Sequence, residues 1–224
     1  MRLWIRNNSL SLVFGILFAG ALFGQSVAGH RTFNDEQRAH GEPTISYARY
    51  VVSSDFGEAV TENWQSEYLQ FSLFILATIW LLQRGSNESK RPEDAGQESD
   101  AQQLLGEHAQ RNSPRWAKLG GWRTRLYSNS LLIVMAALFL GSWFAQSTTG
   151  WTKYNDEQET HAQPTVSWLG YVTRPEFWEK TLQNWQSEFL AVGTMAVFTV
   201  YLRQRGSPES KPVGAPHDQT GTSG

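Results

Sequence analysis

The sequence of 224 residues contains no cysteine. Disulfide bonds, thiolate metal sites and cysteine nucleophiles are therefore excluded. Positive charge is not in excess either, because 19 lysines and arginines stand against 21 aspartates and glutamates, and this balance argues against nucleic-acid binding. No Ser-His-Asp arrangement, dinucleotide fingerprint, Walker loop or redox motif occurs, so we predict no catalytic residue, no enzyme activity and no cofactor.

What the sequence does contain is a second copy of itself. The stretch 8–90 recurs as 129–211 at a constant shift of about 121 positions, without insertion or deletion. Identical residues gather in four blocks: N-D-E-Q-x-x-H, P-T-x-S, N-W-Q-S-E and R-G-S-x-E-S-K. Polar composition separates the copies and follows the second one. The predicted organisation is a first repeat 1–90, a polar cytoplasmic linker 91–121, a second repeat 122–211 and a disordered tail 212–224.

Each repeat holds two apolar stretches that we predict to be membrane-spanning helices. The first stretch of each repeat has about 20 residues without a charge, which at about 1.5 Å per residue crosses a hydrocarbon layer of about 30 Å. The second stretch is shorter, so its span includes Trp64 or Trp185 as an anchor at the membrane interface. The predicted spans are about 9–29, 64–83, 128–150 and 185–204, with outer loops 30–63 and 151–184.

A cleaved signal peptide is the competing interpretation of the N-terminus. Ser26-Val27-Ala28 before Gly29 resembles a small-residue cleavage site. The equivalent segment ending at Gly150 lies in the middle of the chain, where cleavage makes no sense. We therefore expect the first stretch to be retained as a span.

Lysine and arginine predict the orientation of the spans. They flank one side, whereas the two outer loops carry few cations and are acidic. Arg84 and Arg205, in the R-G-S-x-E-S-K blocks, are predicted to anchor the second and fourth spans at anionic headgroups. We predict a multi-pass protein of the cell membrane with its termini and linker in the cytoplasm. Its partners are lipid and either a membrane protein or a second copy of the chain.

The outer loops carry helix signals. The first span is expected to continue to His40, with Gly41 as its cap, and Ser46 or Ser167 should begin a short helix. A longer helix then starts near Ser54, or near Thr173 in the second repeat, with a capping box completed by Glu176. This helix should run into the membrane and stop at Gly85 or Gly206.

A polar layer is predicted where the spans reach the outer surface. Glu67 and Glu188 each lie about one turn inside an interfacial tryptophan, and acids in such a position usually face the protein interior or a water-filled cavity. We expect each to approach a glutamine of the partner span, joined by an asparagine. The layer either glues helices together or forms an ion or proton site. Its members are Gln25, Asn63, Glu67, Gln146, Asn184 and Glu188.

Two Glu-His pairs suggest a metal site. Glu36 and His40, like Glu157 and His161, stand four residues apart and share one face of a helix. Two repeats would supply four oxygen and nitrogen ligands to Zn²⁺ or a similar ion. An ordinary exposed salt bridge is the competing interpretation, because the spacing is common by chance.

The retained blocks resemble a known family when taken together. G-x-x-x-(Phe33 or Tyr154)-N-D-E-Q, P-T-x-S, N-W-Q-S-E and Q-R-G-S-x-E-S-K are similar to those of small bacterial integral membrane proteins described as a domain of unknown function. Trp151 fits the pattern and His30 departs from it. The resemblance implies a multi-pass bacterial membrane protein and no particular activity.

These observations predict an all-α membrane protein. Its four transmembrane helices form two parallel two-span repeats with pseudo-two-fold symmetry, and short helices cap the outer face. The predicted function is that of a non-enzymatic envelope scaffold or partner-binding protein. The alternatives are a small ion or proton channel or transporter with Glu67 and Glu188 at its outer mouth, and a metal-binding protein that uses the outer histidines.

Overall fold

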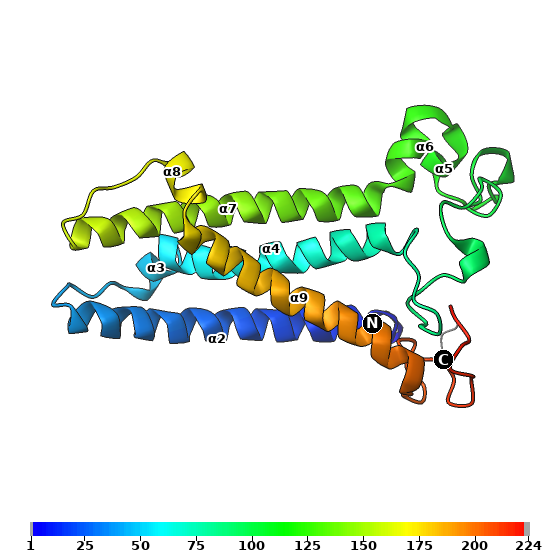
Figure 1. The fold of residues 1–224 in the computed structure, drawn as a ribbon, viewed down its shortest axis with the longest axis horizontal. Helices are drawn as coiled ribbons and strands as arrows, with labels where there is room; N and C mark the ends of the chain where they lie inside the picture. The colour runs from blue at the N-terminus through cyan, green and yellow to red at the C-terminus, as the bar shows by residue number, and fades with distance from the viewer. Residues whose placement is uncertain (1, 222–224) are drawn as a thin grey trace. The chain divides into compact units, whose positions relative to one another are not determined.

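A computed structural model describes residues 2–221, and within that range the chain forms helices and no strand. The prediction of an all-helical protein is therefore confirmed (Figure 1). The elements are α1 (Arg2–Asn7), α2 (Ser9–Ala39), α3 (Tyr47–Tyr50), α4 (Ser54–Ala77), η1 (Pro92–Asp94), η2 (Gly106–His108), α5 (Arg115–Leu119), α6 (Gly121–Ser128), α7 (Ser130–Thr160), α8 (Trp168–Val172) and α9 (Pro175–Tyr201).

The chain divides into two compact units, each made of two segments. The first unit comprises Met1–Thr61 and Ala145–Val172. The second unit comprises Glu62–Phe144 and Thr173–Gly224. Each unit is held together by contacts among its own residues.

In the first unit, α2 and α7 each end in a turn of the same kind. After its turn the chain reverses toward a short helix in both copies (Figure 1). Gly41 takes a φ of +76°, and Glu42 donates its N–H to the Gln37 carbonyl at 2.8 Å. This confirms Gly41 as the residue that ends α2. The second copy places Ala162 at the equivalent position with a φ of +54°. An alanine there is strained, since the left-handed region favours glycine.

The short helix α3 begins as predicted. Ser46 is its N-cap, and its hydroxyl accepts the N–H of Arg49 at 3.4 Å. Ser167 does the same for Gly170 at 3.1 Å, ahead of α8. Both serines thus satisfy a backbone donor that the first turn of a helix leaves unpaired.

The second unit is organised around α9 and the later part of α4. Five aromatic rings of α7 and α9 pack on one another, centred on Trp143, which lies 5.5 Å from Phe139 and 5.8 Å from Trp185 between ring centroids. Phe177 and Trp178 complete the cluster. Phe177 is only 3% exposed, whereas Trp178 is 39% exposed, so the cluster reaches from the apolar interior of this unit to its surface.

The predicted ends of the long helices were wrong. α4 ends at Ala77 and α9 at Tyr201, short of Gly85 and Gly206. The Arg203 guanidinium donates to the carbonyls of Thr199 and Val200, at 3.2 and 3.0 Å, and so replaces the N–H groups that a longer α9 would supply.

The start of α9 agrees with the sequence. The helix begins at Pro175, in the first turn after Thr173 as predicted, and Arg174 precedes it without a capping hydrogen bond from its side chain. Proline at the first position needs no N–H partner, which makes this start favourable. The capping box from Thr173 to Glu176 stays a prediction.

Among the described helices, α2 and α7 are the two that are long and apolar enough to cross a membrane. Their most apolar 18-residue windows have mean hydropathies of 1.9 and 1.6. α4 and α9 do not reach the same level of length and apolarity. The number of spans therefore stands at two by this criterion, against the four that the sequence predicted.

Candidate functional site

The asparagine of the N-D-E-Q block pins the P-T-x-S segment in both copies. Asn34 accepts the N–H of Ile45 at 2.8 Å and lies 3.0 Å from the Ile45 carbonyl as a donor. Asn155 makes the same two bonds with Val166, at 2.9 and 3.0 Å. Two bonds from one amide hold the returning segment in a single register. Both bonds go to the backbone, so the same contact forms with isoleucine in one copy and valine in the other.

His30 and Trp151 occupy the same place and make the same contact. His30 Nε2 lies 2.8 Å from the Ile45 carbonyl oxygen and 2.9 Å from Asn34 Nδ2, so its role depends on the tautomer. Trp151 Nε1 donates to the Val166 carbonyl at 2.7 Å. In the tautomer that carries its proton on Nε2, His30 donates to the returning segment as Trp151 does.

Each short helix also contacts a small residue of the long helix beside it. The Tyr47 hydroxyl is 2.7 Å from that of Ser26, and the Trp168 indole donates to Ser147 at 3.0 Å. Tyr50, which is 5% exposed, lies against Gly29, and Tyr171 lies against Gly150 in the same way. Burial, and after it the Asp55 carboxylate, raise the pKa of Tyr50, so its phenol stays protonated.

A buried ion pair lies in the first unit. Lys153 of α7 contacts Asp55 at 3.5 Å and Glu58 at 3.6 Å, and the Glu58 side chain is only 4% exposed. Burial alone would lower the pKa of Lys153, but the carboxylates of Glu58, Asp55 and Glu157 outweigh it, and its pKa is raised. Lysine is thus held in its charged form. The sequence comparison missed this pair because the first repeat has Thr32 where the second has Lys153.

The four residues of the predicted metal pairs, Glu36, His40, Glu157 and His161, are all exposed. His40 Nδ1 lies 2.9 Å from the backbone carbonyl of Glu36, four residues earlier in the helix. Within residues 2–221, no group of three or more histidine, aspartate or glutamate side chains is placed to hold a metal ion. The metal site stays a prediction, and each copy offers at most two of its ligands.

The two N-W-Q-S-E blocks meet in the second unit, between α4 and α9. Two hydrogen bonds join them: Trp185 Nε1 to Gln65 Oε1 at 2.8 Å, and Ser66 Oγ to Glu188 Oε1 at 3.5 Å. A third, from Asn184 Nδ2 to Glu62 Oε1 at 2.8 Å, ties the second block to the residue just before the first. The partners stand 120 to 122 positions apart, so the two helices run parallel with equivalent residues face to face. Gln65 and Ser66 are 0% and 1% exposed, which makes this polar contact an interior one.

The residues of the predicted polar layer have different surroundings. Asn184 and Glu188 take part in the α4–α9 contact, whereas Asn63 and Glu67 are exposed. Gln65 carries much of the contact and was missed, although it belongs to a block retained in both copies.

The remaining members of that layer belong to the first unit. Gln25 is exposed there, and Gln146 is buried. The expected approach of these glutamines to the glutamates joins residues of different units and stays a prediction.

The tryptophans chosen as interface anchors differ in exposure. Trp64 is 38% exposed, as an anchor should be. Trp185 donates to Gln65 and packs on Trp143, so it has an interior role that the prediction did not include. Arg84 and Arg205 are both exposed.

The first R-G-S-x-E-S-K block folds into a loop, residues 83–90, that we call the first exit loop. Ser89 Oγ accepts the N–H of Gln83 at 2.9 Å. Ser86 Oγ accepts the N–H of Glu88 at 3.1 Å. The two serines thus pair backbone donors that have no helix to join.

The second exit loop, residues 204–211, repeats both bonds. Ser210 accepts from Gln204 at 2.9 Å, and Ser207 accepts from Glu209 at 3.2 Å. The final lysine differs in its surroundings. Lys211 is 1% exposed and donates to three carbonyls of the segment predicted to be a disordered tail, those of Pro216, His217 and Gln219 at 3.1, 2.9 and 3.1 Å.

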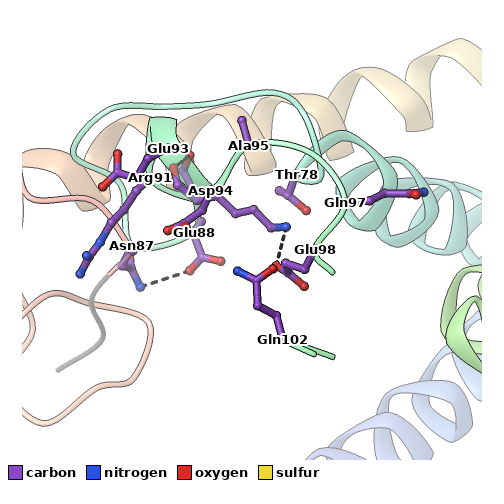
Figure 2. A pocket seen from close by; sticks show the side chains of 13 residues that line it. Thr78, Asn87, Glu88, Arg91, Glu93, Asp94, Ala95, Gln97, Glu98 and Gln102 are labelled. Carbon is purple, nitrogen blue, oxygen red and sulfur yellow. Dashed lines mark hydrogen bonds and ion pairs between the residues drawn. The ribbon is translucent and has the colours of Figure 1, made fainter. Parts of the chain in front are cut away.

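The two exit loops touch each other. Asn87 Nδ2 donates to the Pro208 carbonyl at 3.4 Å, and the carboxyl groups of Glu88 and Glu209 are hydrogen-bonded. Figure 2 shows Glu88 beside Asn87, among the side chains that line a polar pocket at the first exit loop. Burial, and after it the Glu209 carboxyl, raise the pKa of Glu88. One carboxyl of such a pair must hold a proton for the bond to form.

A cavity of about 180 Å³ lies between α4 and α9 in the second unit, next to this carboxyl pair. Its walls are mainly apolar, from Phe71, Phe74, Val192 and Met195, and Glu88 and Glu209 line it as well. Phe71 and Met195 are 47% and 45% exposed, so the cavity is open on one side. Both glutamates are the E of the R-G-S-x-E-S-K block. The sequence comparison marked them as retained, but it gave no signal that the two loops meet.

The family model described as a domain of unknown function (DUF6766) matches residues 1–222. The chain belongs to this family. The resemblance inferred from the retained blocks is therefore confirmed at the level of the family. No curated protein matches the chain, and no solved structure matches it.

Proposed function

We propose that this member of the family is a four-span integral membrane protein that holds a partner in the membrane and does no chemistry of its own. The observation that carries the proposal is the exposure of α2 and α7. In their most apolar windows only 6% and 11% of the residues are buried. A core helix of a soluble protein would be mostly buried, whereas lipid accepts such a surface.

We extend the spans to α4 and α9 for a physical reason. Their lower apolarity comes from polar residues such as Gln65, Ser66 and Ser72, which are at most 7% exposed. Polar groups that face a neighbouring helix lower the mean hydropathy without meeting lipid. The exposed residues of α4 include Leu73 and Leu76, which suit a lipid-facing side.

The parallel contact of α4 and α9 supports two parallel repeats with pseudo-two-fold symmetry. Residues about 121 positions apart face each other along these helices and again at the exit loops, where Asn87 meets Pro208. The N-W-Q-S-E blocks then serve to join the repeats. This use favours the interpretation of the polar layer as glue over an ion pathway.

A binding role is favoured by exposed apolar residues outside the proposed spans. Val52 is 80% exposed and Leu169 is 67% exposed, both in the part of the first unit that we place outside the membrane. Such residues suit contact with a membrane-protein partner or a second copy of the chain.

The natural absence of cysteine allows a direct test of the topology. Single cysteines at Glu42, Ala162 and Gln102 are introduced into the full chain and treated in intact cells with a membrane-impermeant maleimide. We expect strong labelling at positions 42 and 162, and labelling at 102 only after the cells are opened. The lysines and arginines that flank the spans predict a linker on the cytoplasmic side. Labelling of all three in intact cells, or recovery of the protein without membranes, would contradict the four-span proposal.

Ion flux decides between a holding role and transport. In proteoliposomes we expect the purified protein to leave proton and potassium permeability within about twofold of empty liposomes, because the buried polar groups of the N-W-Q-S-E contact are used to join α4 to α9. A larger flux that disappears when Glu67→Gln and Glu188→Gln are combined would replace our proposal with the transport alternative. The single Glu36→Gln variant, an exposed acid outside the proposed spans, is the matched control.

A further inference from the structure

The cavity between α4 and α9 combines two features that suit one class of ligand. Its walls include the side chains of Phe71, Phe74, Val192 and Met195, and its volume is about 180 Å³. Dry apolar cavities of about 150 Å³ are large enough to bind benzene. One aromatic ring or a branched alkyl group therefore fits this space.

The second feature is negative charge. The carboxyl groups of Glu88 and Glu209 also line the cavity. The lysines of the two exit loops are engaged elsewhere: Lys90 pairs with Glu98 at 2.6 Å, and Lys211 donates to three backbone carbonyls. The pair therefore lacks a lysine counter-ion from either loop, and it carries a single negative charge when one proton is shared.

We infer that this cavity binds a small amphiphilic cation, an ammonium group with one aromatic or branched alkyl substituent. The substituent occupies the space between the two phenylalanines and Met195, and the ammonium group lies at the Glu88 and Glu209 carboxyls. Charge complementarity excludes anions. A bare metal ion is disfavoured, because the apolar walls supply no ligand beyond the two carboxylates.

Proton exchange follows from the same geometry. The bound cation replaces the proton that joins the two carboxyls, so binding releases up to one proton. Because the pKa of Glu88 is raised, some of the pair is protonated above the usual range of a glutamate. Affinity should therefore rise with pH until the pair is fully ionised.

The test uses the full chain in nanodiscs and titration calorimetry with benzyltrimethylammonium, whose charge does not change with pH. Benzyl alcohol is the uncharged comparison. We expect the cation to bind at least tenfold more tightly than the alcohol at pH 8, and the difference to shrink at pH 5. Combining Glu88→Gln with Glu209→Gln should remove the cation's advantage while benzyl alcohol still binds, which shows that the cavity remains intact.

Two further variants complete the design. Met195→Trp fills the cavity and should abolish binding of both compounds, whereas Glu93→Gln, which removes an exposed acid of the linker, should change neither. Equal affinity for cation and alcohol overturns the inference. So does cation binding that survives the double glutamine variant or the Met195→Trp variant, because the compound would then be partitioning into lipid or binding elsewhere.

Discussion

Replacement of Lys153 by methionine should lower the free energy of unfolding by about 3 kcal/mol, because it removes a cation that pairs with a buried carboxylate. Glu58 is the charge in question, because its side chain is 4% exposed and lies 3.6 Å from Lys153. Methionine keeps the length of the lysine stem, so packing changes little. The measurement is reversible unfolding of the purified protein in mixed micelles.

A double-mutant cycle shows whether the cost comes from Glu58. Glu58→Gln in the Lys153→Met background should recover at least 1 kcal/mol, since a neutral amide no longer needs a counter-ion. Arg38→Met is the matched control. It breaks an ion pair with Asp35 whose side chains are 65% and 72% exposed, and it should cost under about 1 kcal/mol. Equal losses for the two cations, or no recovery in the cycle, would contradict the assignment.

The second large effect is expected at Gly29, where alanine should destabilise the protein by about 1–3 kcal/mol through overpacking. A methyl group at this position would overlap the Tyr50 hydroxyl and lie 3.1 Å from its ring carbon Cζ. Tyr50 is buried, so its ring has little room to move. Gly150→Ala should behave alike, because its methyl group would meet the Tyr171 hydroxyl and lie 2.7 Å from Glu58 Oε1.

Gly20 provides the control within the same helix. No atom lies within 4 Å of a methyl group added there, so Gly20→Ala should leave stability unchanged or raise it by about 0.5–1 kcal/mol. Tyr50→Phe removes the overlapping oxygen and should restore part of the stability lost in Gly29→Ala. If Gly20→Ala and Gly29→Ala had the same stability, our description of Tyr50 as closely packed on Gly29 would be wrong.

The two glycines show what comparing the repeats can and cannot tell. Gly20 and Gly29 both have a glycine counterpart in the second repeat, at Gly141 and Gly150. Retention alone ranks them equally, yet only Gly29 lies against a buried ring. Spacing along the chain predicts which helix face a residue occupies, but not which side chain from elsewhere reaches it.

Local signals predicted the short-range features best. The cap at Gly41 and the N-cap at Ser46 depend on backbone geometry within a few residues, and both were confirmed. The predicted ends of α4 and α9 were wrong because the side chains that bond the backbone at these ends lie outside the helices. The Arg203 guanidinium ends α9, and Ser89 fixes the backbone of the first exit loop.

The candidate site was only partly predictable for the same reason. The N-W-Q-S-E block is retained in both copies, and the prediction named its acid, Glu67, because a charge near a span suggests a site. Glu67 is exposed, however, and Gln65 makes the contact with Trp185. The parallel packing of α4 and α9 decides which residues of the block face inward. The sequence showed His30 only as a departure from the family pattern, because an imidazole and an indole look unlike although both can donate the same hydrogen bond.

The strained turn at Ala162 has a practical consequence. On one side of it α7 is a continuous helix, and on the other Asn155 fixes Val166 by two hydrogen bonds. The three residues 161–163 therefore act as a spacer between two points that are secured independently, and all three are exposed. A short epitope or a fluorophore attachment site inserted here would report on which side of a membrane this turn lies, while leaving the two bonds of Asn155 in place.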